Sequence, residues 1–324
     1  MRCSCLVLFL LHLFATGGYS GQAQSGPNPG PEYSPEDALL TIRTHTGQSV
    51  FHIGEMIELD LAFTSTAPQK YSLDAAHFER PFGVDNITVT PRLGWEDPFG
   101  AFYKLCPVMY EGGLQNILTL SKQPTIVPIV LNDWFRFERP GEYEIKVDSG
   151  RVSSPNGRSG RIVLSSNRLP IRIIPATAQW QEETLKNAFA VLDQTGTDTY
   201  YWQRMARYRA ARTLRCLGTS AAAREMGKRI KEYEAASSEF ILGLATSPAR
   251  EDSLEALKAL LVDPNFPVFP LDLCAIAFVA LPQEAMGSKD ALEASKARFR
   301  DELRSALPNK RGHALEQSTI TVNQ

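Results

Sequence analysis

The chain has few of the residues that commonly build metal or redox centres. It contains five histidines and five cysteines in 324 residues, and no two histidines stand four positions apart as in a His-Glu-x-x-His zinc helix. No Cys-x-x-Cys pair exists for a thiolate zinc site or a redox dithiol. A Gly-x-Ser-x-Gly elbow, a phosphate-binding glycine-rich loop and an EF-hand loop are also absent. We therefore expect no metal, no cofactor and no catalytic residue that a motif reveals, although two carboxylates distant in sequence can still meet in space.

An excess of positive charge is missing as well. Lysine and arginine total 34 residues against 36 aspartates and glutamates, which gives a formal net charge of −2. Nucleic-acid binding draws on a clear basic excess. This balance therefore argues against nucleic acid as a partner, and against electrostatic docking on an anionic membrane.

Long hydrophobic runs are absent beyond the N-terminus. Met1-Arg2 precedes an apolar run of ten residues, Cys5–Phe14, and Gly21-Gln22-Ala23 then offers the small-x-small pattern that signal peptidase accepts. A helix that spans a bilayer needs ~20 residues. We therefore predict that residues 1–23 are a cleaved signal peptide, that the mature chain has no membrane span, and that it is secreted or periplasmic.

Cysteine is scarce in the predicted mature chain, which keeps Cys106, Cys216 and Cys274. An odd, sparse set cannot form a disulfide framework. If one bridge forms, Cys216–Cys274 is the expected pair, because both residues fall in the part of the chain with a helical pattern. We favour the alternative, in which all three are buried thiols that pack as small apolar side chains.

The first half of the mature chain has an apolar period of two. It follows a leader over 24–36 that is rich in Gly, Pro, Ser and Gln and is expected to be flexible. Apolar and polar residues alternate, as Leu61 and Asp60 do, so each strand should have one face in a core and one in water. The clearest strands cover 57–64, 86–90, 142–148, 162–164 and 171–173. Short strands separated by turns predict an antiparallel β-sandwich over 37–175.

The second half changes to a period of 3.6 after Pro175. Gly218-Thr219 predicts the end of one helix and the N-cap of the next. Asp263-Pro264 predicts another helix end, and the apolar stretch 271–281 predicts a helix buried on all sides. We therefore predict an α-helical domain over 176–307 and a polar, disordered tail over 308–324.

A dense group of aromatic residues lies between 91 and 125, where neither period holds. Long loops in compact domains are uncommon and often functional. Our candidate ligand-binding residues are therefore Trp95, Phe99, Phe102 and Tyr103, since such rings can stack on sugars or grip a peptide. The competing interpretation, which we slightly favour, is that they plug the end of the sandwich or dock onto the helical half.

Two phrases, Phe51-His-Ile-Gly-Glu55 and Phe137-Glu-Arg-Pro-Gly-Glu-Tyr143, resemble those at strand starts in secreted immunoglobulin-like or macroglobulin-type sandwich domains. The patterns over 211–222 and 253–268 resemble HEAT-type repeats. The whole chain resembles uncharacterised secreted bacterial proteins that join these two modules. The resemblance implies an immunoglobulin-like β-sandwich followed by a HEAT-like α-solenoid, and it brings no known activity.

Three functional hypotheses follow from these observations. The leading one is a secreted or periplasmic binding or scaffold protein without catalytic activity, whose partner is a protein, a peptide or a carbohydrate. The first alternative is an inhibitor or adaptor of a secreted hydrolase. The second alternative is a polysaccharide-active enzyme whose carboxylates come together only in the folded chain.

Overall fold

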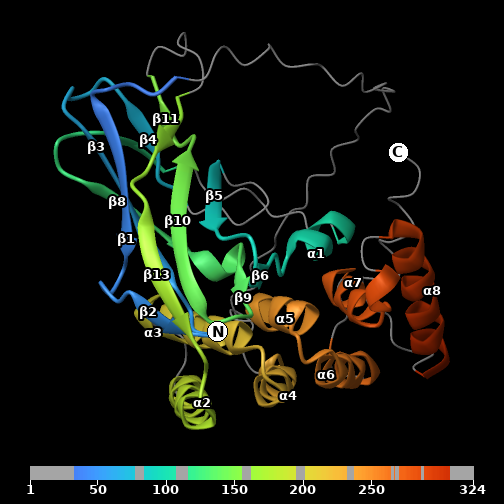
Figure 1. Cartoon of the computed structure of the whole chain (residues 1–324). Helices are drawn as coiled ribbons and strands as arrows, with labels where there is room; N and C mark the ends of the chain where they lie inside the picture. Colours follow the sequence, from blue (N-terminus) through green and yellow to red (C-terminus); the bar gives the residue numbers. More distant parts are fainter. Residues whose placement is uncertain are drawn as a thin grey trace, which may run out of the picture.

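Strands occupy the first part of the chain and helices the second. The structure is a computed structural model that describes residues 33–306, apart from 77–83, 107–115, 155–161, 195–200, 232–236, 264–265, 267–269 and 286–287. The predicted signal peptide, most of the leader and the tail after 306 therefore lie outside the described residues. Figure 1 shows the strands gathered on one side and the helices in rows on the other.

The strands form several small sheets that are mostly antiparallel. One sheet has the order β1-β3-β8, and a second has the order β12-β10-β13-β2, with β5 paired to β10 on the other side. In this second sheet the β13–β2 pair is parallel. The smaller sheets are β11-β4-β7 and β6-β9. The strands are β1 (Ala38–Thr44), β2 (Val50–His52), β3 (Glu58–Ser65), β4 (Ser72–Asp74), β5 (Asp85–Thr90), β6 (Trp95–Glu96), β7 (Ile117–Thr119), β8 (Thr125–Val130), β9 (Arg136–Phe137), β10 (Gly141–Ser149), β11 (Val152–Ser153), β12 (Leu164–Ser165) and β13 (Leu169–Ile174).

The two larger sheets share one hydrophobic core. Leu61 and Phe63 of β3 and Ile145 and Val147 of β10 are fully buried in the same cluster. Alternate residues of β10 are buried, as the period of two predicted. This shared core joins the two larger sheets into one β half.

One expectation for β3 is wrong. Asp60 was expected on a face in water, but only 3% of its surface is exposed. Its carboxylate accepts a hydrogen bond from Arg43 Nε at 3.2 Å and lies 2.8 Å from His45 Nδ1. Arg43 of β1 lies directly opposite Asp60, and its side chain and that of His45 cover the carboxylate.

The helices follow directly after β13 and stand in two rows. Within the described residues, α3, α5 and α7 pack in succession, and α4 and α6 pack against them from the other side. The first helix after the strands, α2, packs on α3, and the last, α8, packs on α7. The helices are α1 (Gly100–Leu105), α2 (Ala178–Leu192), α3 (Tyr201–Leu217), α4 (Ser220–Arg229), α5 (Ser237–Thr246), α6 (Arg250–Val262), α7 (Pro270–Val279) and α8 (Lys289–Ala306), with short 3-10 turns η1 (Leu131–Asp133) and η3 (Gln283–Ala285).

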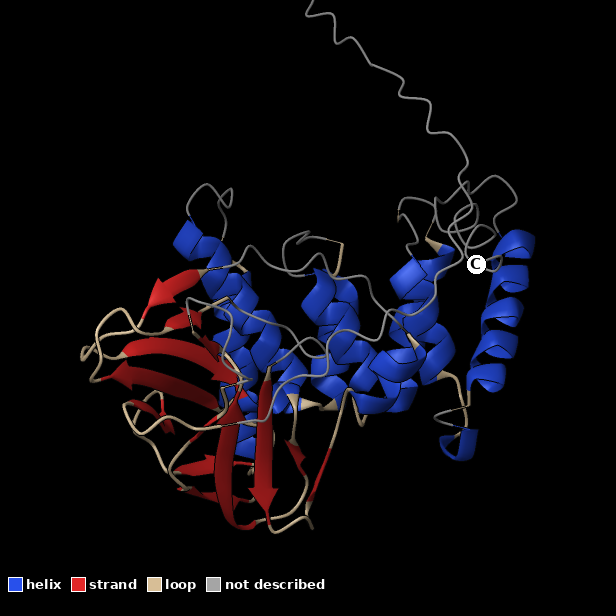
Figure 2. Cartoon of the chain, turned by 90° about the horizontal axis from the view of Figure 1, so that it is seen from above, coloured by secondary structure: helices blue, strands red, loops and turns tan. Residues whose placement is uncertain are grey.

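Helix ends lie where the sequence signals placed them. Gly218 has a φ of 60°, and the Thr219 side chain caps α4 by accepting a hydrogen bond from the Ala222 N–H. Asp263 is the C-cap of α6. The apolar helix α7 is buried among its neighbours. Figure 2 shows the helices in blue beside the strands in red. None of the helices in the described part of the chain is long and apolar enough to cross a membrane.

Helix α1 belongs to the helical half by packing, although it precedes most of the strands in the chain. Phe102 and Leu105 are buried in the same hydrophobic cluster as the helices after 176. Phe102 packs edge-on against Phe278 of α7, with ring centroids 5.3 Å apart. The helix therefore bridges from the sheets to the helical rows (Figure 1).

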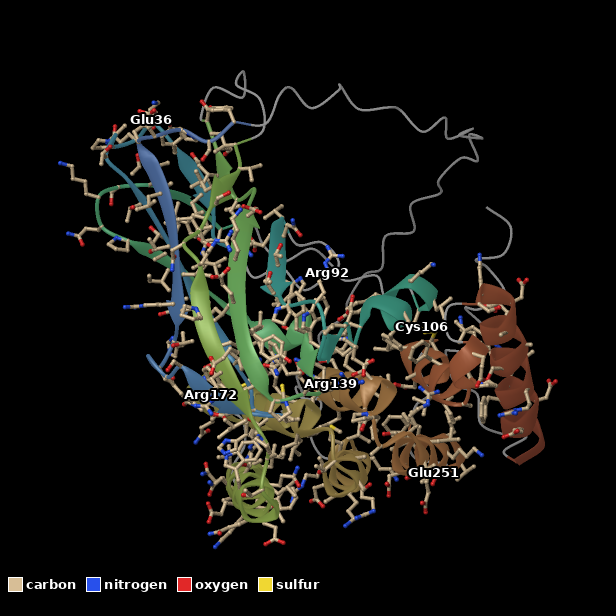
Figure 3. The ribbon with its side chains drawn as sticks, viewed as in Figure 1. Glu36, Arg92, Cys106, Arg139, Arg172 and Glu251 are labelled. Atoms are coloured by element: carbon tan, nitrogen blue, oxygen red, sulfur yellow. A yellow bond between two sulfur atoms is a disulfide. The ribbon has the colours of Figure 1, made fainter. Side chains whose placement is uncertain are left out.

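The cysteine expectations are wrong. Cys106, which caps the C-terminus of α1, forms a disulfide with Cys274 of α7, and Cys216 is a free, buried thiol. Figure 3 places Cys106 beside the helical half. The bond joins positions 168 residues apart, and only the packing of α1 against α7 brings them together. Neither a Cys216–Cys274 pair nor three free thiols is present.

A buried group of charges joins the β half to the helices, and we call it the junction. Arg215 of α3 lies 2.5 Å from Asp133 of η1 and 2.8 Å from Glu239 of α5, and Arg212 lies 3.0 Å from Glu239. At most 16% of any of these side chains is exposed. At the rim of the junction, Arg136 Nη1 donates to the Thr246 carbonyl at 2.7 Å. Two arginines thus meet two carboxylates, so the buried charges balance.

Candidate functional site

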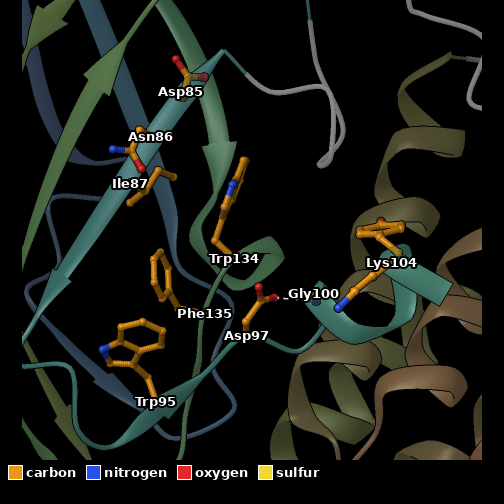
Figure 4. Close-up of a pocket in the computed structure, with 10 residues that line it drawn as sticks. Asp85, Asn86, Ile87, Trp95, Asp97, Gly100, Lys104, Trp134 and Phe135 are labelled. Atoms are coloured by element: carbon orange, nitrogen blue, oxygen red, sulfur yellow. Dashed lines mark hydrogen bonds between the residues drawn. The ribbon is translucent and has the colours of Figure 1, made fainter. Parts of the chain in front are cut away.

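A cleft of about 590 Å³ lies between the β half and α1. One wall is β5, the floor comes from β6 and the segment after η1, and the other wall is α1 (Figure 4). The volume falls in the range of ~300–1,000 Å³ that is typical of ligand sites. The residues that line it are Asp85, Asn86, Ile87, Trp95, Asp97, Gly100, Tyr103, Lys104, Trp134 and Phe135.

The structure divides the four predicted site residues into two pairs. Trp95 and Tyr103 are half-buried and line the cleft. Phe99 and Phe102 are 2% and 0% exposed and pack in the core of the helical half. These two therefore hold α1 against the helices, which is the docking role considered above. Ligand contact by Trp95 and Tyr103 stays a prediction.

Trp95 is held in place by contacts on two sides. Its ring packs edge-on against Phe135, with centroids 4.6 Å apart, and its Nε1–H donates to the Pro91 carbonyl at 2.9 Å. The indole donor is thus already used. What Trp95 offers a ligand is the uncovered part of its ring surface, which is suited to apolar contact.

Asp97 forms the corner where the β half passes into α1. Its Oδ1 accepts hydrogen bonds from the N–H groups of Phe99 at 3.1 Å and Gly100 at 2.8 Å. A Cβ on residue 100 would lie 2.4 Å from Asp97 Oδ2, so the close approach of this carboxylate requires glycine there. The aspartate therefore sets the direction of α1, and with it the width of the cleft.

Asp85 is the first residue of β5, and its charge is balanced by that of Arg151. Its Oδ2 is 2.8 Å from both Nε and Nη2 of Arg151, and its Oδ1 accepts a hydrogen bond from Ser149 Oγ at 2.6 Å. Both side chains of the ion pair are at least 98% buried. The Arg151 Nη1 group also donates to the carbonyls of Asp74 and Ala76. This pair fixes the start of β5 and brings no net charge to the cleft.

Two exposed polar residues lie on the two walls of the cleft. Asn86 is exposed on β5, and Lys104 is exposed on α1, where Figure 4 shows its amine reaching back toward Asp97. Lys104 makes no ion pair with any described residue. The cleft thus combines apolar ring surface with one accessible cation, an arrangement that suits binding through shape and a few polar contacts.

Most of these residues gave no sequence signal. Asp97 before Pro98 could have been recognised as a helix-capping residue. Asp85 and Arg151 could not have been recognised as an ion pair, because 66 residues separate them in the chain. The sequence pattern does not distinguish Trp134 and Phe135 from ordinary core residues. The dense aromatic run was the one useful signal, and it identified Trp95 and Tyr103.

Other reactive groups in the described residues do not form a second site. Burial raises the pKa of the Cys216 thiol to about 12, so this thiol is protonated and unreactive at neutral pH. His52 stacks on Trp180 with centroids 4.4 Å apart, and its Nδ1 lies 3.1 Å from Glu55 Oε2. The ring stack packs α2 against β2. No group of three or more His, Cys, Asp or Glu side chains suited to a metal occurs in the part of the chain that the structure describes.

No protein-family model and no curated protein matches the chain. Among solved structures, the seventh ScaB type I cohesin from Pseudobacteroides cellulosolvens is similar at 9% identity, over 43% of this chain and 94% of the cohesin, with a TM-score of 0.19. The native conformation of E. coli alpha-2-macroglobulin is similar at 12% identity, over 88% of this chain and 22% of that protein, with a TM-score of 0.23. The chain thus corresponds to less than a quarter of the macroglobulin. At these TM-scores neither likeness bears on function.

Proposed function

We propose that this chain is a secreted or periplasmic binding protein without catalytic activity, and that the cleft between β5 and α1 binds a protein or peptide partner. The observation that carries the proposal is the cleft itself, about 590 Å³ of space where the two halves meet. Ligand sites favour such boundaries, and they combine aromatic walls with a few polar groups. Trp95, Tyr103 and Lys104 supply that combination here.

The carboxylates of the cleft support binding more than catalysis. A general acid or base must be free to exchange its proton with a substrate. Asp85 is held in a buried ion pair with Arg151, and Asp97 accepts the two main-chain hydrogen bonds that begin α1. Both carboxylates therefore support the fold, which leaves the polysaccharide-active alternative without a described acid–base pair in this cleft.

We infer that the β half is an immunoglobulin-like sandwich and that the helical half is a HEAT-like solenoid. The core shared by the two larger sheets supports the first inference. The two rows of helices, with α3, α5 and α7 in one and α4 and α6 in the other, support the second. Scaffolds of both kinds commonly carry binding surfaces on otherwise inert frameworks.

The proposed location outside the cytoplasm rests on two features. The apolar run before Gly21-Gln22-Ala23 is typical of a signal peptide. The Cys106–Cys274 disulfide is of the kind that persists in oxidising compartments and is rare in the cytosol. The two features are independent of each other, and both favour export.

Trp95→Ala tests the proposed site. The purified wild-type chain and the variant are immobilised, and each is exposed to the secreted fraction of the source organism. We expect wild type to retain a specific protein or peptide that the variant does not retain, because the variant removes the ring surface at the floor of the cleft. Circular dichroism and thermal melting establish that both chains are folded.

Trp180→Ala is the matched control, since Trp180 is also half-buried but stacks on His52 away from the cleft. It should retain the same molecules as wild type. Equal retention by Trp95→Ala and wild type would show that binding does not use the cleft. If the retained molecule is a hydrolase that loses activity when bound, the inhibitor or adaptor alternative becomes the specific form of the proposal.

A further inference from the structure

Strand β5 is an edge strand, and its free edge faces the cleft. Its six residues pair with β10 in antiparallel register, and within the described residues no strand pairs with its other side. The cleft is lined by the first three residues of β5, Asp85, Asn86 and Ile87. An unpaired edge exposes a row of N–H and C=O groups that another extended chain can use.

The hydrogen-bond pattern of β10 shows which groups of β5 are free. Val147, opposite Ile87, donates its N–H to Ser166 Oγ at 2.9 Å and accepts from the Ser166 N–H at 2.8 Å, on the side away from β5. On the other side, the Gly150 N–H donates to the Val84 carbonyl at 2.9 Å. In an antiparallel ladder the bonded pairs alternate. The residues of β5 that bond to β10 are therefore Asn86, Thr88 and Thr90.

It follows that the main-chain groups of Asp85, Ile87 and Val89 point away from β10, toward the cleft side. Their side chains are buried under the sheet, so what they present at the edge is backbone alone. No described residue bonds to the main chain of Ile87 on this side. A row of donors and acceptors two residues apart is the surface to which a β-strand adds.

The rest of the cleft fits the side chains of such a strand. Trp134 and Phe135 are only 9% and 6% exposed, so they offer little open ring face on which a sugar could stack. Trp95 at the floor and Tyr103 on the α1 wall are half-buried, and their rings can contact one large apolar side chain. Lys104 on the opposite wall has no ion partner among the described residues, so it complements a carboxylate.

We propose that the cleft binds an extended peptide segment of its partner as an added strand along β5, with an apolar side chain beside Trp95 and an acidic group beside Lys104. This inference rests on the proposed function and specifies how the same site works. The main chain of the ligand supplies affinity through bonds to Ile87 and its neighbours, and the two side-chain contacts supply selectivity.

The test uses a displayed library of random ten-residue peptides, selected on the full-length chain. We expect enriched peptides that are apolar or aromatic with one acidic residue. Their affinity should fall by about tenfold or more in Trp95→Ala and in Lys104→Glu, which corresponds to the loss of one good contact. Lys122→Glu, a charge reversal at an exposed lysine outside the cleft, should leave it unchanged.

Two measurements on one selected peptide then test strand addition itself. N-methylation of alternate peptide amides should abolish binding in one register and leave it intact in the other, because only every second N–H faces β5. On binding, the hydrogen exchange of the Ile87 amide should slow by about tenfold or more. The exchange of the Thr88 amide, which is already bonded to β10, should change little.

The failure of this inference is distinct from the failure of the proposed function. Binding that depends on Trp95 with no alternation in either measurement would overturn strand addition and leave the cleft as a ligand site. Enrichment of no peptide, together with cleft-dependent binding on an oligosaccharide array, would overturn the peptide class alone. If neither library binds in a manner that depends on Trp95, both proposals fall.

Discussion

Two of the contacts between the halves of the chain, the junction and the cleft, differ in how closely the facing side chains pack. At the junction, Arg212 and Arg215 are sealed against Asp133 and Glu239, with almost no exposed surface. At the cleft, β5 and α1 stand apart around about 590 Å³ of space, with Lys104 exposed. One contact fixes how the halves sit, and the other leaves room for a ligand.

Different interactions hold the junction and the cleft rigid. A buried charge cluster is rigid only while every member keeps its partner, because an uncompensated buried charge is costly. The cleft is held open by covalent and local bonds, namely the Cys106–Cys274 disulfide behind α1 and the Asp97 hydrogen bonds at its start. Breaking each set should therefore have a different consequence.

The largest effect is expected from Arg215→Met. The variant keeps most of the side-chain volume but removes the junction cation that lies nearer to both Asp133 and Glu239. Breaking a buried ion pair in this way costs about 3–5 kcal/mol, so urea unfolding should show a loss of that size. Arg224→Met removes an exposed arginine that pairs with Asp252, and it should cost about 0–1 kcal/mol. Equal losses in both variants would contradict the sealed junction.

A smaller loss is expected when the disulfide behind the cleft is removed. Replacing Cys106 and Cys274 together by alanine should cost about 2–4 kcal/mol, the usual contribution of a native disulfide, and wild type treated with a reductant should lose the same amount. Because α1 is the wall of the cleft, peptide binding should weaken along with stability. Cys216→Ala, which alters no bridge, is the control.

The pairing can also be read directly by alkylation. Unfolded but unreduced wild type should react with iodoacetamide at Cys216 and not at Cys106 or Cys274, as mass spectrometry of the peptides will show. Alkylation at all three residues would show that the bridge is absent and that all three cysteines are free thiols. The bridge would then no longer support an extracytoplasmic location.

The sequence predicted the parts of the fold that depend on local periodicity. Ile145 and Val147 are buried as their period of two predicted, and Thr219 caps a helix as its position after Gly218 predicted. These features need only a few neighbouring residues to be recognised. The prediction of which β3 residues face water was wrong at Asp60, because Arg43 and His45 cover its carboxylate.

Features that join distant segments could not be predicted. Helix α1 has six residues, too few to show a helical period, and it is recognised only by the packing of Phe102 against Phe278. The Cys106–Cys274 bridge depends on that packing. In the cleft, the aromatic run pointed to Trp95 and Tyr103, but the free edge of β5 depends on a strand order that one sequence does not contain.

The smallest effect is expected at the rim of the junction, where the contact changes from buried to exposed. Glu96 and Glu138 both approach Arg136, and about half of each glutamate side chain is exposed. A hydrogen bond between the two carboxyls raises the pKa of Glu138 above its usual 4.5 and lowers the pKa of Glu96 below it. The stability of the rim should therefore depend on pH.

The sign of the response differs for the two glutamates. The raised pKa of Glu138 means that the folded chain holds more protons than the unfolded chain above pH 4.5, so its contribution is lost as the pH rises through the folded pKa. The lowered pKa of Glu96 means that its contribution is lost as the pH falls below 4.5. Together they should give a stability contribution that is greatest near pH 4.5.

Glu138→Gln isolates the stability contribution of Glu138, because an amide keeps a hydrogen-bond donor toward Glu96 at every pH. Relative to wild type, the variant should gain stability as the pH rises from 4.5 to 7, in urea unfolding measured at several pH values. Glu142→Gln makes the same change of charge at an exposed site paired with Arg172, away from the junction, and it should show no such trend. If the stability difference between Glu138→Gln and wild type does not change with pH, the two carboxyls do not share a proton. The rim of the junction is then ordinary solvent-exposed surface whose charges act independently.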